Sequence, residues 1–189
     1  MAIKTASGSG LTNSLSSGLV LLNTTSFSGV ASQSVNDVFS ASYDNYRIIY
    51  NSDNISNAGS SVTMRMRVSG ADNSSANYNF SILYNSPATA NTNTLNRENN
   101  AEATPTTSFY VLRDDSDGGT SYSAFDIHNP FATKKTALAG FWMFSDAASR
   151  FYSGFATGQM TVTTSYTGFT IISSSGNIGG TISVYGYNK

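Results

Sequence analysis

His128 is the only histidine in the 189-residue chain, and Asp126 lies two residues before it. Residues two apart in a β-strand point to the same face, so these side chains could contribute to a Ser-His-Asp site for hydrolysis. The sequence has no Gly-x-Ser-x-Gly nucleophile elbow, and serine is so abundant that a serine close to the histidine is expected by chance. A hydrolase, such as an esterase or a polysaccharide depolymerase, is therefore the least favoured interpretation. We predict no catalytic residues and no enzymatic activity.

The acidic residues do not form the kind of pair that glycoside hydrolysis needs. Such a pair consists of two carboxyl groups about 5–10 Å apart across a cleft. Asp114, Asp115 and Asp117 crowd one turn, and Glu98 and Glu102 fall in a long polar segment. Neither group lies where a packed core would hold an acid and a base in place.

Motifs for metal binding are also missing from the sequence. The chain has no cysteine and one histidine, so a zinc site would need at least two carboxylates beside His128. Residues 113–120 superficially resemble an oxygen-ligand calcium loop, but they lack the downstream bidentate glutamate of an EF-hand. A hairpin turn at Asp117 and Gly118 is the favoured interpretation, and ion binding by Asp114 to Asp117 stays open. We predict no metal and no cofactor.

The composition argues against several classes of partner. Only 11% of the residues are charged, the formal net charge is -1, and the ten lysines and arginines are scattered. Without a basic stripe to neutralise a run of phosphates, we expect no nucleic-acid partner. The N-terminus lacks the apolar region of a signal peptide, and no segment approaches the roughly 20 apolar residues that span a bilayer. We expect a protein made in a reducing cytoplasm, without membrane insertion.

Alternation of apolar and polar residues with a period of two predicts β-strands. The pattern is clearest at residues 62–69, where Val62, Met64, Met66 and Val68 would face the core. No window sustains a helical period beyond a short turn near residues 41–45. Further strands are expected at residues 18–23, 35–39, 46–51, 78–84, 108–112, 122–128, 136–144, 151–157, 159–164, 169–173 and 180–187. The pattern predicts an all-β fold, an antiparallel β-sandwich that is jelly-roll-like, with a single domain over residues 18–189.

Two polar segments are candidates for contacts with other molecules. Residues 1–17 have the Gly, Ser and Thr content of a flexible tail, but Ile3, Leu11 and Leu15 could dock on a second chain. We therefore predict an extended N-terminal arm that anchors the protein in an assembly. Residues 85–107 are too long for an ordinary connection, which favours a solvated excursion or a partner-contacting loop. Asn93 and Arg97 are the candidate contacts in that loop.

Tyrosine and phenylalanine, eleven of each, are the one chemical excess of the chain. Most of them are expected to pack in the core and between strands. Tyr78, Tyr84 and Tyr152 are the candidates for exposed rings that stack on sugars or contact a subunit.

The stretch Val38-Phe-Ser-Ala-Ser-Tyr-Asp-Asn-Tyr-Arg-Ile-Ile49 resembles a segment of small bacteriophage virion proteins and of terminal domains of tail-fibre-like proteins, especially from marine and freshwater phages. The similarity extends to residues 18–22, 25–29, 64–70, 129–131, 164–169 and 180–187. It covers most of the chain from residue 18 onward and depends on the order of these blocks. The long shaft of a fibre protein is missing, so capsid decoration and a small tail-attached tip both stay open.

The resemblance implies a non-enzymatic structural protein on the virion surface, made in the host bacterial cytoplasm. Its expected partners are other virion proteins of the capsid or tail, reached through the N-terminal arm, and further copies of itself, with a trimer as one arrangement. Exposed loops would then face the host or solvent. The alternative is a carbohydrate-binding, lectin-like receptor-binding module whose partner is a host-surface glycan.

Overall fold

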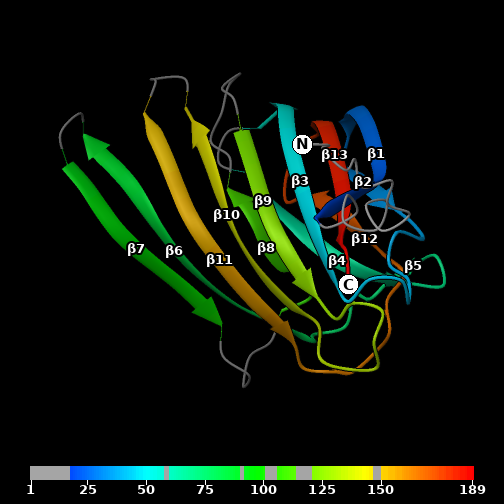
Figure 1. Cartoon of the computed structure of the whole chain (residues 1–189). Coiled ribbons are helices and arrows are strands. Elements are labelled where there is room, and N and C mark those ends of the chain that lie inside the picture. Colours follow the sequence, from blue (N-terminus) through cyan, green and yellow to red (C-terminus); the bar gives the residue numbers. More distant parts are fainter. Residues whose placement is uncertain (1–17, 58–59, 90–91, 101–105, 114–120, 147–149) are drawn as a thin grey trace, which may run out of the picture.

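The computed structural model describes residues 18–57, 60–89, 92–100, 106–113, 121–146 and 150–189 (Figure 1). These residues form two antiparallel β-sheets packed against each other, and no helix is present among them. A helix of the length and hydropathy that crosses a membrane is therefore not found in the described ranges. The predicted all-β antiparallel sandwich is confirmed.

The large sheet has eight strands. In spatial order they are β1 (Leu19–Val30), β13 (Ile178–Tyr187), β3 (Asn45–Ile55), β9 (Ser121–His128), β10 (Ala137–Ser145), β11 (Phe151–Met160), β6 (Tyr78–Thr89) and β7 (Thr92–Asn100). The small sheet contains β2 (Ser32–Val35), β12 (Gly168–Ser173), β4 (Ser61–Val68) and β5 (Ala71–Asp72), and β8 (Phe109–Arg113) pairs with β4. In Figure 1, β6 and β7 form one end of the large sheet, and β1 and β13 form the other.

Most of the predicted strands are present, and two predictions are wrong. Residues 159–164 do not form a separate strand, because β11 continues to Met160 and the chain then leaves the sheet. Residues 35–39 are not a strand beyond Val35. The N–H groups of Val38 and Phe39 instead both donate to the carbonyl of Thr167, which bends the chain toward β3.

The alternation in β4 sets one buried face, as the sequence predicts. Val62, Met64 and Met66 are fully buried, and the residues between them are half-buried. Val68 departs from the prediction and is 37% exposed, because β4 ends there and the chain turns back at Ser69 and Gly70, both with positive φ.

An aromatic cluster around Trp142 fills the space between the sheets. Trp142 is 1% exposed, and its ring centre lies 6.0 Å from Tyr84, 6.4 Å from Tyr110 and 6.0 Å from Phe144. Gly154 on the neighbouring strand β11 makes room for this ring, because a Cβ atom there would lie 2.5 Å from Trp142 Cζ2. A small residue at position 154 is therefore a packing requirement of the core.

The prediction of a long excursion over residues 85–107 is wrong for much of its length. β6 and β7 form an antiparallel hairpin in which Leu83 pairs with Arg97 and Tyr84 with Asn96. The polar sequence of β7 conceals the strand because β7 lies at the end of the large sheet, where alternation of buried and exposed residues is not required. The hairpin extends the large sheet at the end that Figure 1 shows away from β2 and β12.

Candidate functional site

A polar cluster lies on the outer face of the large sheet, over β3, β9 and β13. Tyr187 Oη donates a hydrogen bond to Asp126 Oδ1 (2.7 Å), and Arg47 Nη1 lies 3.7 Å from the same oxygen. His128 Nδ1 lies 3.0 Å from Asn45 Oδ1. Asp126 and His128 thus share a face, as their spacing predicts, but each has its own partner. Within the described ranges no serine hydroxyl is hydrogen-bonded to His128.

The protonation of this cluster fits a structural role. Partial burial, followed by the hydrogen bond to Asp126, raises the pKa of Tyr187 above its ordinary value. Tyr187 therefore keeps its proton and stays a donor to the carboxylate at neutral pH. The hydrogen bond with Tyr187 in turn raises the pKa of Arg47. The cluster joins three neighbouring strands through groups that satisfy one another.

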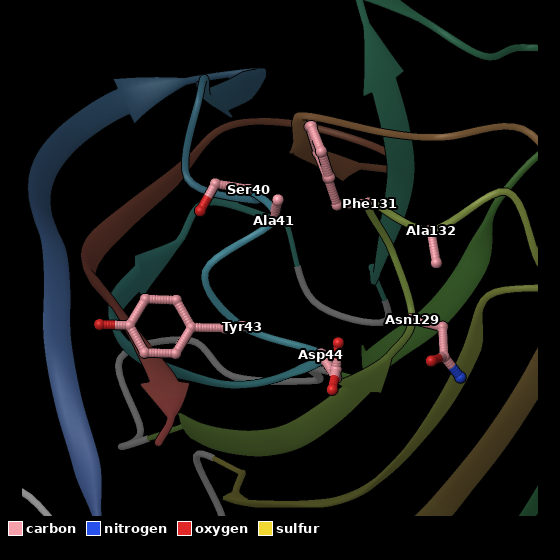
Figure 2. A pocket seen from close by; sticks show the side chains of 7 residues that line it. All are labelled: Ser40, Ala41, Tyr43, Asp44, Asn129, Phe131 and Ala132. Atoms are coloured by element: carbon pink, nitrogen blue, oxygen red, sulfur yellow. The ribbon is translucent and has the colours of Figure 1, made fainter. Parts of the chain in front are cut away.

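A pocket of about 220 Å³ lies between the connections β2–β3 and β9–β10 (Figure 2). Its lining residues are Ser40, Ala41, Tyr43, Asp44, Asn129, Phe131 and Ala132. In Figure 2 the Tyr43 ring extends away from Phe131 and Ala132. That ring packs edge-on against Tyr46 at 5.9 Å, and the Asp44 carboxylate pairs with Lys189 Nζ at 3.0 Å. The two connections are joined by the backbone hydrogen bond from Asn129 N–H to the carbonyl of Asp44 (2.8 Å), and we assign the pocket no ligand.

The prediction that Tyr78 and Tyr152 are exposed is wrong. Tyr78 is fully buried, its hydroxyl donates to Asn73 O (2.7 Å), and Met66 N donates to that hydroxyl (3.0 Å). Burial raises the pKa of Tyr78, so its hydroxyl remains a neutral link between β4 and β6. Tyr152 is 8% exposed, and its ring stacks on Phe144 with centres 4.5 Å apart. Tyr84 is half-buried beside Trp142.

The other candidate residues fall in three places. Ile3, Leu11 and Leu15 lie outside the described residues, as does the proposed hairpin turn at residues 114–120. Asn93 belongs to β7, where it pairs with Pro87. Arg97 is exposed on β7 and stands directly opposite Leu83. The structure therefore does not bring the predicted contact residues together as one site.

Apolar side chains gather on the outer face of the large sheet at the end opposite the polar cluster. Phe141, Phe155 and Leu83 are direct cross-strand neighbours on β10, β11 and β6. Phe151 and Leu95 project from the same face, on β11 and β7. The exposed fractions are 67% for Phe155, 70% for Leu95, 52% for Phe151 and 45% for Leu83, and Phe141 is half-buried. These five residues are named the apolar wing below.

Polar groups between the residues of the apolar wing are already hydrogen-bonded to one another. Asn85 Nδ2 donates to the carbonyl of Phe151 (3.1 Å), and Ser153 Oγ donates to Asn85 Oδ1 (2.9 Å). Asn85 and Ser153 are cross-strand partners, so these bonds join β6 to β11 across the outer face. A partner that covers Asn85 and Ser153 would leave these bonds intact, which keeps the cost of removing water from the two side chains low.

The apolar wing was missed because β11 inverts the usual rule. The sequence Phe151-Tyr-Ser-Gly-Phe-Ala156 suggests that the phenylalanines face the core, yet Tyr152, Gly154 and Ala156 are buried and Phe151 and Phe155 are exposed. Position 154 has no side chain because Trp142 fills the volume in front of it, and Ala156 two residues later is also small. Small residues alternating with phenylalanine beside a tryptophan-containing strand are the signal that could have identified this outer face.

Within the described ranges, no group of three or more His, Asp or Glu residues is placed to hold a metal ion. The apolar wing is therefore the feature that most clearly distinguishes this molecule from a sandwich with a uniformly polar surface. Comparison of the chain with known family models, with curated proteins and with solved structures found no significant match in any of the three.

Proposed function

We propose that the protein is a non-enzymatic structural module of a bacteriophage virion, placed on the particle surface as a capsid-decorating or tail-associated protein. The sequence blocks that resemble phage virion proteins, and the order in which they follow one another along the chain, support the viral setting. The apolar wing supports a role in assembly, and it is the observation that carries the proposal. A protein that worked alone in water would leave such a surface exposed at a cost in solubility.

The apolar wing has the composition of an interface core. Aromatic side chains are enriched and charged side chains are depleted at the centres of protein interfaces. The wing contains three phenylalanines and two leucines, and no charged residue occurs in β10, β11 or β6. Of the three aromatic residues that the lectin-like alternative would use to stack on sugars, Tyr78 and Tyr152 are core residues, so this alternative has less support.

Attachment to the particle is assigned in this proposal to residues 1–17. Deleting them is expected to leave the melting temperature nearly unchanged, because Ile3, Leu11 and Leu15 offer little apolar area against about 1–2 kcal/mol of backbone entropy per ordered residue. The same deletion should abolish incorporation into the particle. Mass spectrometry of gradient-purified particles, with the truncated gene replacing the original, measures incorporation against the major capsid protein.

A matched pair of full-length variants separates loss of contacts from loss of length. The triple variant Ile3→Ser, Leu11→Ser, Leu15→Ser should lose incorporation, whereas Thr5→Ala with Thr12→Ala should retain it. A truncated protein that still assembles at full occupancy would contradict this assignment, and attachment would then belong to a face of the sandwich.

A further inference from the structure

We propose that the apolar wing binds the apolar wing of a second copy of this chain, with the two large sheets stacked face to face across a two-fold axis. This inference rests on the proposed role in assembly and names the partner of one surface. A two-fold interface brings the same patch of both copies together, so the patch must be compatible with itself. Three properties of the wing favour such a contact between two copies.

The first property is the distribution of charge over the outer face of the large sheet. β6, β10 and β11 carry no Asp, Glu, Lys or Arg, and β7 carries only Arg97 and Glu98. The other half of the same face holds Arg47, Asp126 and Tyr187. Arg97 is the one charged side chain of these four strands on the outer face, and it lies on the edge strand opposite Leu83. A partner with several charged groups over the phenylalanines would therefore bury most of its charges unpaired, at a high cost. A second wing brings the same weakly charged surface.

The second property is the area that pairing would bury. If a phenylalanine side chain offers roughly 200 Å², the exposed fractions of Phe151 (52%) and Phe155 (67%) leave roughly 240 Å² of ring surface in water. Leu83 and Leu95, 45% and 70% exposed, raise the apolar total to roughly 400 Å² per copy, within the range of patches that are often functional. Two wings would bury roughly 800 Å² of apolar surface, so their polar neighbours, such as Ser81 and Thr157, would need to add roughly 400 Å² to reach the roughly 1,200 Å² of a small specific interface.

The third property is rigidity. The strands of the wing are fixed from behind by Trp142, Ile82 and Ala156, all buried, and from the front by the hydrogen bonds of Asn85. A surface already held in its binding conformation loses little conformational entropy when it pairs. Stacked sheets pack about 10 Å apart with their side chains interleaved, a spacing that suits Phe155 and Leu83 meeting the same residues of another copy.

Sedimentation velocity of the purified full-length chain at about 1–100 µM tests the inference. We expect a concentration-dependent dimer. Phe155→Ser and Leu83→Ser should each weaken dimerisation at least about tenfold, because central aromatic and aliphatic contacts contribute most of the binding energy. Leu21→Ser is the control, since Leu21 is 56% exposed on the opposite edge strand β1, and the variant should dimerise like the original chain. Circular dichroism and melting curves confirm that each variant is folded.

Single-cysteine cross-linking locates the contact independently of affinity, because the chain has no cysteine of its own. Ser81→Cys and Thr157→Cys place a thiol on the exposed outer face beside the wing, at paired positions of β6 and β11. Ser183→Cys places one on the same face in β13, at the other end of the sheet. A short bismaleimide should give covalent dimers from the first two variants at several times the yield from the third.

The possible results separate this inference from the proposed function. A chain that stays monomeric at 100 µM and cross-links equally at all three positions overturns the two-copy contact. So does a dimer that persists in Phe155→Ser and Leu83→Ser. The occupancy of Phe155→Ser in purified particles then decides what the wing does: reduced occupancy would mean that it binds a different virion protein and the proposed function stands. Normal occupancy of this variant would show that the wing has no role in assembly.

Discussion

Replacing Trp142 with alanine is expected to lower the free energy of unfolding by about 3–5 kcal/mol, the range for truncation of a large aromatic side chain in a core. Trp142 is 1% exposed and packs against three other aromatic residues. Its removal opens a cavity that Gly154 cannot fill from the neighbouring strand, because that position has no side chain. Urea unfolding followed by tyrosine fluorescence and circular dichroism measures the change.

Phe155→Ala is the matched control for Trp142→Ala. Phe155 lies on the neighbouring strand β11 and is also a large aromatic residue, but it points outward and is 67% exposed. Its removal from the isolated chain should cost less than about 1 kcal/mol, the size of a cross-strand contact. Equal losses of stability in the two variants would contradict the assignment of the inner and outer faces of the large sheet.

Gly180→Ala is expected to destabilise the fold by about 2–4 kcal/mol through backbone strain and steric overlap. Gly180 has a φ of 134°, a conformation that side-chain-bearing residues rarely adopt, and a Cβ atom there would lie 2.1 Å from the carbonyl oxygen of Asn51. The residue sits at the irregularity in the pairing of β13 with β3, and β13 is paired on both sides, with β1 and with β3. Neither the chain of β3 nor that of β13 can move aside without breaking the ladder.

Gly179→Ala is the neighbouring control for this prediction. Gly179 has no positive φ, and the nearest atom to a Cβ there, Ser28 Cα, would be 3.3 Å away. We expect a loss of less than about 1 kcal/mol, measured in the same urea titration. If Gly180→Ala were as stable as Gly179→Ala, that result would contradict the close approach of β13 to β3 at this irregularity.

The strands of the core could be predicted from local sequence because their alternation has one cause, the burial of a single face. β4 and β13 show it clearly, with Met64, Met66, Ile182 and Val184 all buried. The same logic placed Asp126 and His128 on one face of β9. It could not show that Asp126 faces Tyr187 and His128 faces Asn45, because those partners come from strands distant in sequence.

The remaining features depend on which elements meet, and local pattern does not contain that information. β7 is a strand because β6 offers it a ladder, although its own sequence is typical of a polar loop. Phe155 points outward because Trp142 occupies the space on the other side of β11. Tyr78 can be buried because its hydroxyl is hydrogen-bonded to the backbone groups Met66 N and Asn73 O. No rule of residue spacing predicts these contacts. The apolar wing therefore could be identified only once the packing of neighbouring strands was known.

The most direct test of the proposed role is the location of the protein in an infection. Particles of a phage proposed to encode this chain would be purified through two gradients and analysed by quantitative mass spectrometry, with gold-labelled antibody marking the position on the particle. We expect the protein to co-purify with the major capsid protein at a fixed molar ratio and the label to lie on the particle surface. Recovery of the folded protein only in the soluble fraction of the lysate, with none in infectious particles, would contradict it.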